Sequence, residues 1–372
     1  MSPTIALAFT ENKHTKSGWA GFSEYAKYDF DRYPHVGLLT FAGQALALLM
    51  ARSYRTQGYN VHILNLNESS HDISTDIVIH KLTNVLDRAE DGDPKAVEQL
   101  QKFESFVANT PVVDPLPAVR RLLKRERTMD LLQDIIQRTR KEDVPLFHIA
   151  PFAVLSRAEI LSQRYVNLVK FPAVIKHVTA ASSQPAHQMA IVPSSQQLNT
   201  ALTELAGPSE NPSADKWFLQ EWVNHDGVIF KVFVLGDYVH TVVRPSLQNI
   251  TSGHGIFHFD SQKIPKSFAE DFACQSNSNV PAFATSLSSD ARKAKELELD
   301  TDRAQEISRV LAKDLQLTLF GFDLIVESGT GRHFVIDINY CPGYEGVPNF
   351  HAEVLHVIQQ KIQKDRKGAE RV

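Results

Sequence analysis

The sequence has few cysteines and no long apolar run, and both shortages exclude classes of protein. Its two cysteines, Cys274 and Cys341, are too few for a disulfide framework or for a zinc site built on paired CxxC motifs. No stretch approaches the roughly 18 apolar residues that cross a membrane. The N-terminal segment lacks the basic start and apolar core of a signal peptide. We therefore expect a protein of the reducing cytoplasm that does not associate with membranes.

The chain also lacks a net positive charge and the common phosphate-binding motifs. The formal net charge is −4, which argues against a general nucleic-acid binder, because such proteins are usually basic. The chain contains neither the GxxxxGK[ST] pattern of a P-loop nor the HRD and DFG motifs of protein kinases. A small anionic ligand is still compatible with this composition, since a local cluster of lysines can hold one.

The first third of the chain has the pattern of a small parallel α/β layer. Apolar runs predict strands at Thr4–Phe9, 60–66 and 77–80, and an Ala/Leu-rich run predicts a buried helix over 38–54. Strand, helix and strand in succession favour a parallel sheet. An amphipathic helix follows over 95–109, and the PVVDPLP segment at 111–117 predicts a domain boundary. The aromatic, charged segment 16–38 is expected to be a loop or insertion.

The rest of the chain alternates between strands and helices. The patterns predict two helical stretches over 118–140, strands at 173–176, 188–192 and 218–223, and a helix over 195–205. Two hairpins follow, at 228–243 and 319–339, with a helix over 301–315 between them and a last one over 350–364. The Ser/Asn-rich segment 274–287 predicts a loop.

Acidic side chains on the last hairpin predict a metal site. Asp337 and Asn339 lie two apart on one strand and therefore share a face. If 328–332 is the connecting loop, Glu327 opposes His333, and Asp323 then opposes Asp337. Two carboxylates this close would repel each other unless a hard cation lay between them, and oxygen ligands favour magnesium. The alternative is that Asp337 and Asn339 form a turn or a hydrogen-bonded polar cluster.

Lysines within apolar strands predict an anion site. Lys176 ends one apolar strand and Lys231 interrupts another. Each either reaches solvent from a two-faced sheet or faces a cleft that holds an anion, because an unpaired buried lysine is costly. Magnesium carboxylates and strand lysines together are what nucleotide phosphates require. A basic stripe on the helix that follows residue 118 is more typical of a solvated face; it consists of Arg120, Arg121, Lys124 and Arg125.

Several segments together resemble the inositol-tetrakisphosphate 1-kinase family, also called inositol 1,3,4-trisphosphate 5/6-kinases, which are ATP-grasp proteins. They occur in family order from about residue 80 to about residue 350, and their combination is specific. The segments are HKLT at 80–83, DPLPAVR at 114–120, HQMAIV at 187–192, QEWVNHDGVIFKVFV at 220–234, RPSLQN at 244–249, LFGFD at 319–323 and VIDINYCPGYEGV at 335–347.

The resemblance implies an α/β ATP-grasp fold in three parts. These are an N-terminal α/β domain over 1–115, a central subdomain over 116–222 and a C-terminal subdomain with the metal site over 223–372. It also implies an inositol polyphosphate kinase that uses ATP and magnesium, with two ions expected. The partners implied are ATP and an inositol tris- or tetrakisphosphate, with neither nucleic acid nor membrane, and we expect a monomer.

The resemblance also implies roles for individual residues. Lys176, Asp337 and Lys231 would be catalytic. The residues implied in ATP binding are Arg125, Lys176, Gln220, Glu221, Val223, Lys231, Ser246 and Ser261. Those implied in substrate binding are Lys13, Lys81, His187, Lys231, Arg244, Asn339 and Gly343. The implied metal ligands are Asp323, Asp337 and Asn339.

Two departures from the family pattern and two rival functions stay open at this point. The loop between Lys176 and His187 lacks the usual His-Gly pair, and the segment 16–38 is longer than expected. A carboxylate–amine ligase of the ATP-grasp type would share the nucleotide lysines and the carboxylate hairpin. A non-catalytic inositol-phosphate-binding protein is the second rival, and the intact Lys176, Asp323 and Asp337 argue against it.

Overall fold

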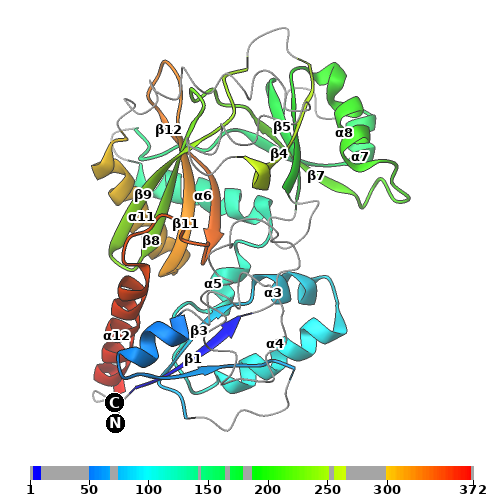
Figure 1. The fold of residues 1–372 in the computed structure, drawn as a ribbon. Helices are drawn as coiled ribbons and strands as arrows, with labels where there is room; N and C mark the ends of the chain where they lie inside the picture. The colour runs from blue at the N-terminus through cyan, green and yellow to red at the C-terminus, as the bar shows by residue number, and fades with distance from the viewer. Residues whose placement is uncertain are drawn as a thin grey trace, which may run out of the picture. The chain divides into compact units, whose positions relative to one another are not determined.

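A computed structural model of the chain describes residues 3–9, 50–67, 74–140, 144–163, 168–178, 187–250, 255–264 and 299–369 (Figure 1). The chain divides into two compact units. Unit 1 consists of Met1–Asp114 and Asn349–Val372, and unit 2 of Pro115–Pro348. The expected helix over 38–54 lies mostly outside the described residues, although residues 50–56 are helical. The segments 16–38 and 274–287 lie wholly outside them.

Unit 1 is built on a parallel three-stranded sheet in the order β2-β1-β3. The strands are β1 (Thr4–Phe9), β2 (Asn60–Ile63) and β3 (Ile77–Lys81). The helices are α3 (Thr83–Glu90), α4 (Pro94–Phe106) and α12 (Phe350–Ala369). Ile5 and Leu7 in β1 are fully buried, as expected of a strand at the centre of a parallel sheet.

The last helix of the chain belongs to this unit. We expected 350–364 to continue the C-terminal subdomain, whereas α12 is part of unit 1. Two hydrogen bonds hold it to this unit, from Gln359 to the Tyr59 hydroxyl at 2.6 Å and from Arg366 to Asp76 at 3.1 Å. The division of the remaining residues into three parts stays a prediction.

Unit 2 contains a five-stranded antiparallel sheet in the order β10-β6-β5-β7-β4. Its strands are β4 (Phe152–Ser156), β5 (Ala173–His177), β6 (Gln188–Val192), β7 (Lys216–Glu221) and β10 (Phe257–Asp260). The helices α7 (Arg157–Leu161) and α8 (Leu198–Ala206) pack on one face of the sheet (Figure 1). Lys176 and Phe218 are directly opposed and alternate with residues of this core, so they lie on the other face.

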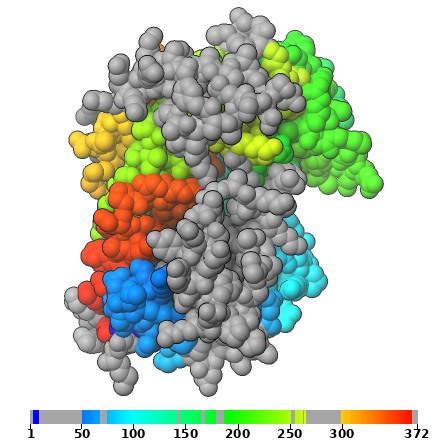
Figure 2. Space-filling view, in the orientation of Figure 1, coloured from blue at the N-terminus to red at the C-terminus, as the bar shows by residue number. Residues whose placement is uncertain are grey.

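The second sheet of unit 2 has four antiparallel strands in the order β12-β11-β8-β9. They are β8 (Val228–Leu235), β9 (Tyr238–Pro245), β11 (Leu319–Val326) and β12 (His333–Tyr340). The helices of this part are α5 (Leu116–Arg120), α6 (Arg125–Thr139) and α11 (Thr301–Leu315). The segment after β12 contributes orange-red atoms to the face shown in Figure 2.

Most predicted elements are present, and the exceptions have local causes. The parallel sheet of unit 1, the two hairpins and the helix over 301–315 are confirmed. The patterns missed α3, β4, α7 and β10. β4 is an edge strand whose burial does not alternate, so it carries no clear period-2 signal. The short α7 that follows it begins with a capping box between Ser156 and Glu159.

Gly321 in β11 lets the segment after β12 pack against the four-stranded sheet. A Cβ at this position would lie 3.0 Å from Pro342 Cγ and 3.1 Å from the Val232 carbonyl oxygen. We expect Gly321→Ala to lower the free energy of unfolding by about 1–3 kcal/mol, because the backbone of β8 cannot move aside. Chemical denaturation measures the change. Gly255→Ala is the control, since nothing lies within 4 Å of a Cβ there, and equal stability of the two variants would contradict the packing argument.

Candidate active site

The two hairpin carboxylates are directly opposed, as predicted, although the register near the loop differs. Val326, and not Glu327, opposes His333. The register shifts between Asp323 and Leu324, and this irregularity brings Asp323 opposite Asp337. The expected opposition therefore arises from a bulge and not from a continuous ladder.

Each carboxylate has a cationic partner. Lys231 is the cross-strand neighbour of Asp323 on β8, and its Nζ lies 2.8 Å from Asp323 Oδ1. Arg125 Nη1 lies 3.6 Å from Asp337 Oδ1. Asn339 Nδ2 donates to Asp337 Oδ2 at 3.0 Å. The positive charges of one lysine and one arginine thus balance two carboxylates that would otherwise repel each other.

The donor set of this cluster fits a hard divalent cation. Asp323, Asp337 and Asn339 offer only oxygen ligands, which suit magnesium and not zinc. The side chains of Asp323 and Asp337 are 18% and 32% exposed, so an ion could reach them. Within the described ranges, no group of three or more His, Cys, Asp or Glu side chains is placed to hold a metal. A site here would therefore need the Asn339 amide and ligands from outside the protein.

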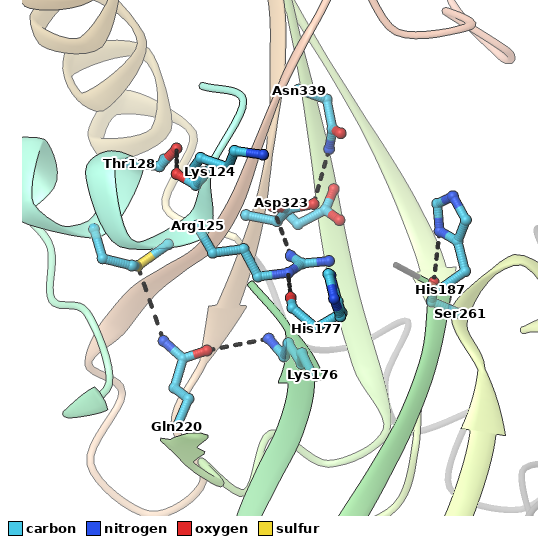
Figure 3. A network of polar contacts seen from close by, with 12 residues as sticks. Lys124, Arg125, Thr128, Lys176, His177, His187, Gln220, Ser261, Asp323 and Asn339 are labelled. Carbon is cyan, nitrogen blue, oxygen red and sulfur yellow. Dashed lines mark hydrogen bonds and ion pairs between the residues drawn. The ribbon is translucent and has the colours of Figure 1, made fainter. Parts of the chain in front are cut away.

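Lys176 lies close to this cluster on the five-stranded sheet (Figure 3). Its Nζ donates to Gln220 Oε1 at 3.1 Å, and the Gln220 amide nitrogen donates to the Ala150 carbonyl at 3.4 Å. Burial and, to a lesser degree, the charge of Arg125 lower the pKa of Lys176 to about 8, while Asp337 and Asp323 act in the opposite direction. Gln220 is itself buried, so the amide fixes the position of the ammonium group.

Arg125 joins the two sheets of unit 2. It begins α6, its backbone N–H donates to the Val178 carbonyl at 3.0 Å, and its Nε donates to the His177 carbonyl at 3.2 Å. The same guanidinium forms the ion pair with Asp337 on the other sheet. Burial lowers the pKa of Arg125 and Asp337 raises it, but an arginine stays protonated.

The prediction of a solvated basic stripe is wrong for two of its members. Arg125 is 7% exposed. Arg121 donates to the Asp314 carbonyl at 3.2 Å and also to that of Leu315, at the C-terminal end of α11. Cations are favourable at that end of a helix, so this arginine has a structural partner.

His187 immediately precedes β6. It lies beside Ser261, one of the two serines that the family resemblance implies in ATP binding. Its Nδ1 is 3.3 Å from Ser261 Oγ (Figure 3). Burial and then the charge of Arg125 lower the pKa of His187, while Asp260 and Asp337 oppose that shift. The imidazole is therefore neutral at neutral pH until an anion approaches it.

Ser246 is held by a histidine that the sequence patterns did not single out. His225 is 4% exposed, its Nδ1 lies 2.7 Å from the Val223 carbonyl oxygen, and its Nε2 lies 2.8 Å from Ser246 Oγ. Burial lowers the pKa of His225. Because a carbonyl can only accept, Nδ1 of the neutral ring carries the proton, and Ser246 donates to Nε2. The only signal in the sequence was the position of His225 in the polar segment NHDG at 224–227, between two strands.

The remaining predicted residues occupy several environments. Glu221 accepts from the Lys170 backbone at 2.8 Å, and Val223 packs against a small core that includes Ala150. Arg244 on β9 lies near Glu345. Lys81 ends β3 in unit 1, and Lys13 lies outside the described residues. Unit 2 thus brings together Arg125, Lys176, Lys231, Asp323, Asp337 and Asn339.

Residues 146–360 match the inositol 1,3,4-trisphosphate 5/6-kinase ATP-grasp domain, which is more than half of the chain. The chain belongs to this family. The predicted family is thereby confirmed. The inositol-tetrakisphosphate 1-kinase of Xenopus laevis is 30% identical over 85% of this chain and 75% of its own length. Inositol-tetrakisphosphate 1-kinase 1 of Arabidopsis thaliana is 27% identical over 78% of this chain and 82% of its own.

Solved structures confirm the ATP-grasp fold of this family member. D-alanine–D-alanine ligase from Bacillus anthracis superposes with a TM-score of 0.53 at 11% identity, covering 99% of this chain and 100% of the ligase. At that identity the likeness concerns the fold alone. None of the helices in the described ranges is long and apolar enough to cross a membrane.

Proposed function

We propose that this ATP-grasp protein transfers the γ-phosphoryl group of ATP to a ring hydroxyl of an inositol tris- or tetrakisphosphate. The observation that carries the proposal is the cluster of Lys176, Arg125 and Lys231 around Asp323 and Asp337. This cluster lies in the chain whose family consists of inositol phosphate kinases. An ATP-grasp kinase works with ATP and a divalent cation. We propose that this cation is magnesium and that two ions bind.

The nucleotide half of the proposal assigns roles to the residues around the cations. Lys176 and Arg125 would contact phosphate oxygens of ATP, while Gln220 holds Lys176 in place. Magnesium, held by Asp323, Asp337 and Asn339, would neutralise phosphate charge when bound. Positioning and charge neutralisation supply most of the rate in such transfers, so a strong general base is not required. Val223 and Ser246 would line the nucleoside side of the site.

The substrate half rests on cationic side chains that the family resemblance implies, of which Lys231 pairs with Asp323. His187, Lys231 and Arg244 of unit 2 would contact phosphates of the ring. Lys81 of unit 1 and Lys13, which lies outside the described residues, stay predictions from the family resemblance. Each phosphate carries between one and two negative charges at neutral pH, so several cations are needed to bind such a ring. Lys231 has a double role, because it also lies 2.8 Å from Asp323.

A panel of inositol phosphates with γ-labelled ATP tests the proposal. We expect label in the inositol phosphate, and positional analysis of the product identifies the hydroxyl. Amino acids and small carboxylic acids form the parallel arm of the assay. ADP formation that depends on these acids, with no labelled inositol phosphate, would instead favour a ligase. The monomeric state and the cytoplasmic location stay predictions that sedimentation and cell imaging can check.

His187 gives the proposed substrate site a pH dependence. Its lowered pKa leaves the ring neutral in the free protein, whereas a bound phosphate stabilises the imidazolium and raises that pKa. Binding then takes up a proton, so affinity for the inositol phosphate should fall as pH rises through the pKa of the bound state. His187→Gln should show a flatter profile and, at pH 6, about 10-fold weaker binding. Parallel profiles in calorimetry would remove His187 from the substrate site.

A further inference from the structure

One acidic side chain lies where the proposed site expects a phosphate. Glu345 belongs to the segment 341–347 that follows β12. Its Oε2 lies 3.5 Å from Arg244 Nη2, and its backbone carbonyl accepts from the same nitrogen at 3.4 Å. A Cβ placed on Gly343 would lie 3.2 Å from Glu345 Oε1. The carboxylate therefore lies against both Arg244 and Gly343, which the sequence predicted as substrate contacts.

The strand register places this contact on the face that carries the metal carboxylates. Val242, Lys231, Asp323 and Asp337 form one row across the four strands. Arg244 is two residues beyond Val242 on β9 and therefore points to the same face. A Cβ on Gly346 would lie 3.2 Å from Val242 Cγ2, and the rings of Tyr344 and Phe233 lie 5.5 Å apart. The segment with Glu345 thus packs on this face.

Arg244 keeps donor capacity that Glu345 does not use. Its side chain is 13% exposed, whereas that of Glu345 is 44% exposed. Within the part of the chain that the structure describes, the buried Nε of Arg244 has no hydrogen-bond partner. A contact of 3.5 Å to a half-exposed carboxylate is worth little. A phosphate can accept from Nε and Nη together, which is the stronger, bidentate arrangement.

We propose that Glu345 is a specificity-determining residue that competes with a substrate phosphate for Arg244. The proposal rests on the proposed function, because it deepens the substrate side of the same site. In the free protein the carboxylate neutralises Arg244. A ring phosphate with about two charges displaces it, and the site thereby selects against ligands whose charge is too low to compete. If the ion pair instead served to orient Arg244 for the substrate, neutralising Glu345 would weaken binding.

Binding of inositol hexakisphosphate to the full chain without nucleotide tests this competition by calorimetry. We expect Glu345→Gln to bind about 3- to 10-fold more tightly than the wild type, because the phosphate no longer has to displace a carboxylate from Arg244. Glu327→Gln is the matched control. It removes the same charge from the turn between β11 and β12, where Glu327 pairs with Arg332 at 2.7 Å, and its affinity should stay within about twofold of the wild type. In an Arg244→Gln background the gain from Glu345→Gln should disappear.

Equal or weaker binding by Glu345→Gln would overturn the proposal, as would the absence of binding in both proteins. Glu345→Ser serves as a second variant if the glutamine variant does not fold, and it should also bind more tightly. The kinase assay with labelled ATP is independent of this measurement. If the wild type is an active kinase and Glu345→Gln does not bind more tightly, the competition is wrong and the kinase function stands. If Glu345→Gln binds more tightly and no phosphoryl transfer occurs, the kinase function is wrong and the competition stands.

Discussion

Asp337→Asn should lower kcat by about 10³-fold with every inositol phosphate, because the amide removes one charge from the proposed magnesium site and from the ion pair with Arg125. Asparagine keeps the shape of the side chain and its neighbours. Alanine is the less clean replacement, since it also leaves a cavity beside a buried guanidinium. Single-turnover kinetics with labelled ATP measures the effect apart from product release.

A second ligand variant, at Asp323, and a control variant, at Asp302, accompany this measurement. Asp323→Asn should also lower kcat, because it likewise removes one charge from the proposed metal site. Asp302→Ala removes an exposed acid from the first turn of α11, and it should retain normal kcat. Near-normal turnover in Asp337→Asn, at any magnesium concentration, would show that the carboxylate hairpin holds no catalytic metal.

Lys176→Met should lower kcat/KM for ATP by about 10²- to 10³-fold. Methionine keeps the length of the stem and removes the charge. The free energy of unfolding should stay the same or rise, because burial already disfavours the ammonium, as its lowered pKa shows. Steady-state kinetics and thermal unfolding together separate this outcome from a general loss of structure.

The lysine also predicts a pH limit for the wild type. Its ammonium has a pKa of about 8 in the free protein, so kcat/KM for ATP should fall as pH rises above that value. The fall should be absent in Lys176→Arg, whose guanidinium stays protonated. A flat wild-type profile up to pH 9 would mean that Lys176 does not bind the nucleotide as a cation.

An element of the fold could be predicted from the sequence where its signal is local, and could not where its structure arises from pairing with distant residues. The strands of unit 1 and the hairpin elements were predictable because their apolar periods are complete within a few residues. The opposition of Asp323 and Asp337 was predicted from loop counting, yet it exists because the register shifts between Asp323 and Leu324, which leaves Ile336 of β12 unpaired. That irregularity has no glycine or proline to signal it. The edge strand β4 lacked alternation, and its pairing with β7 decides its structure.

The members of the polar cluster were named from the sequence, but the contacts between them were not. Residue types and the family resemblance indicated Lys176, Arg125 and Asp337. The pairing of Lys231 with Asp323 required the register between β8 and β11, and the contact of His225 with Ser246 spans 21 residues. Glu345 was not singled out from the sequence, because only the fold brings its carboxylate to Arg244.

The shift of register within the last hairpin separates two tasks along the same pair of strands. On the loop side, Val326 opposes His333 and the turn is closed by Glu327 and Arg332. On the other side, the ladder through β8 fixes Asp323 and Asp337. Because the offset is absorbed between the two parts, the turn at 327–332 can change in sequence and even in length while the carboxylates stay in place. The hairpin tip is therefore the part of this sheet where we expect an inserted epitope or reporter to disturb the carboxylates least.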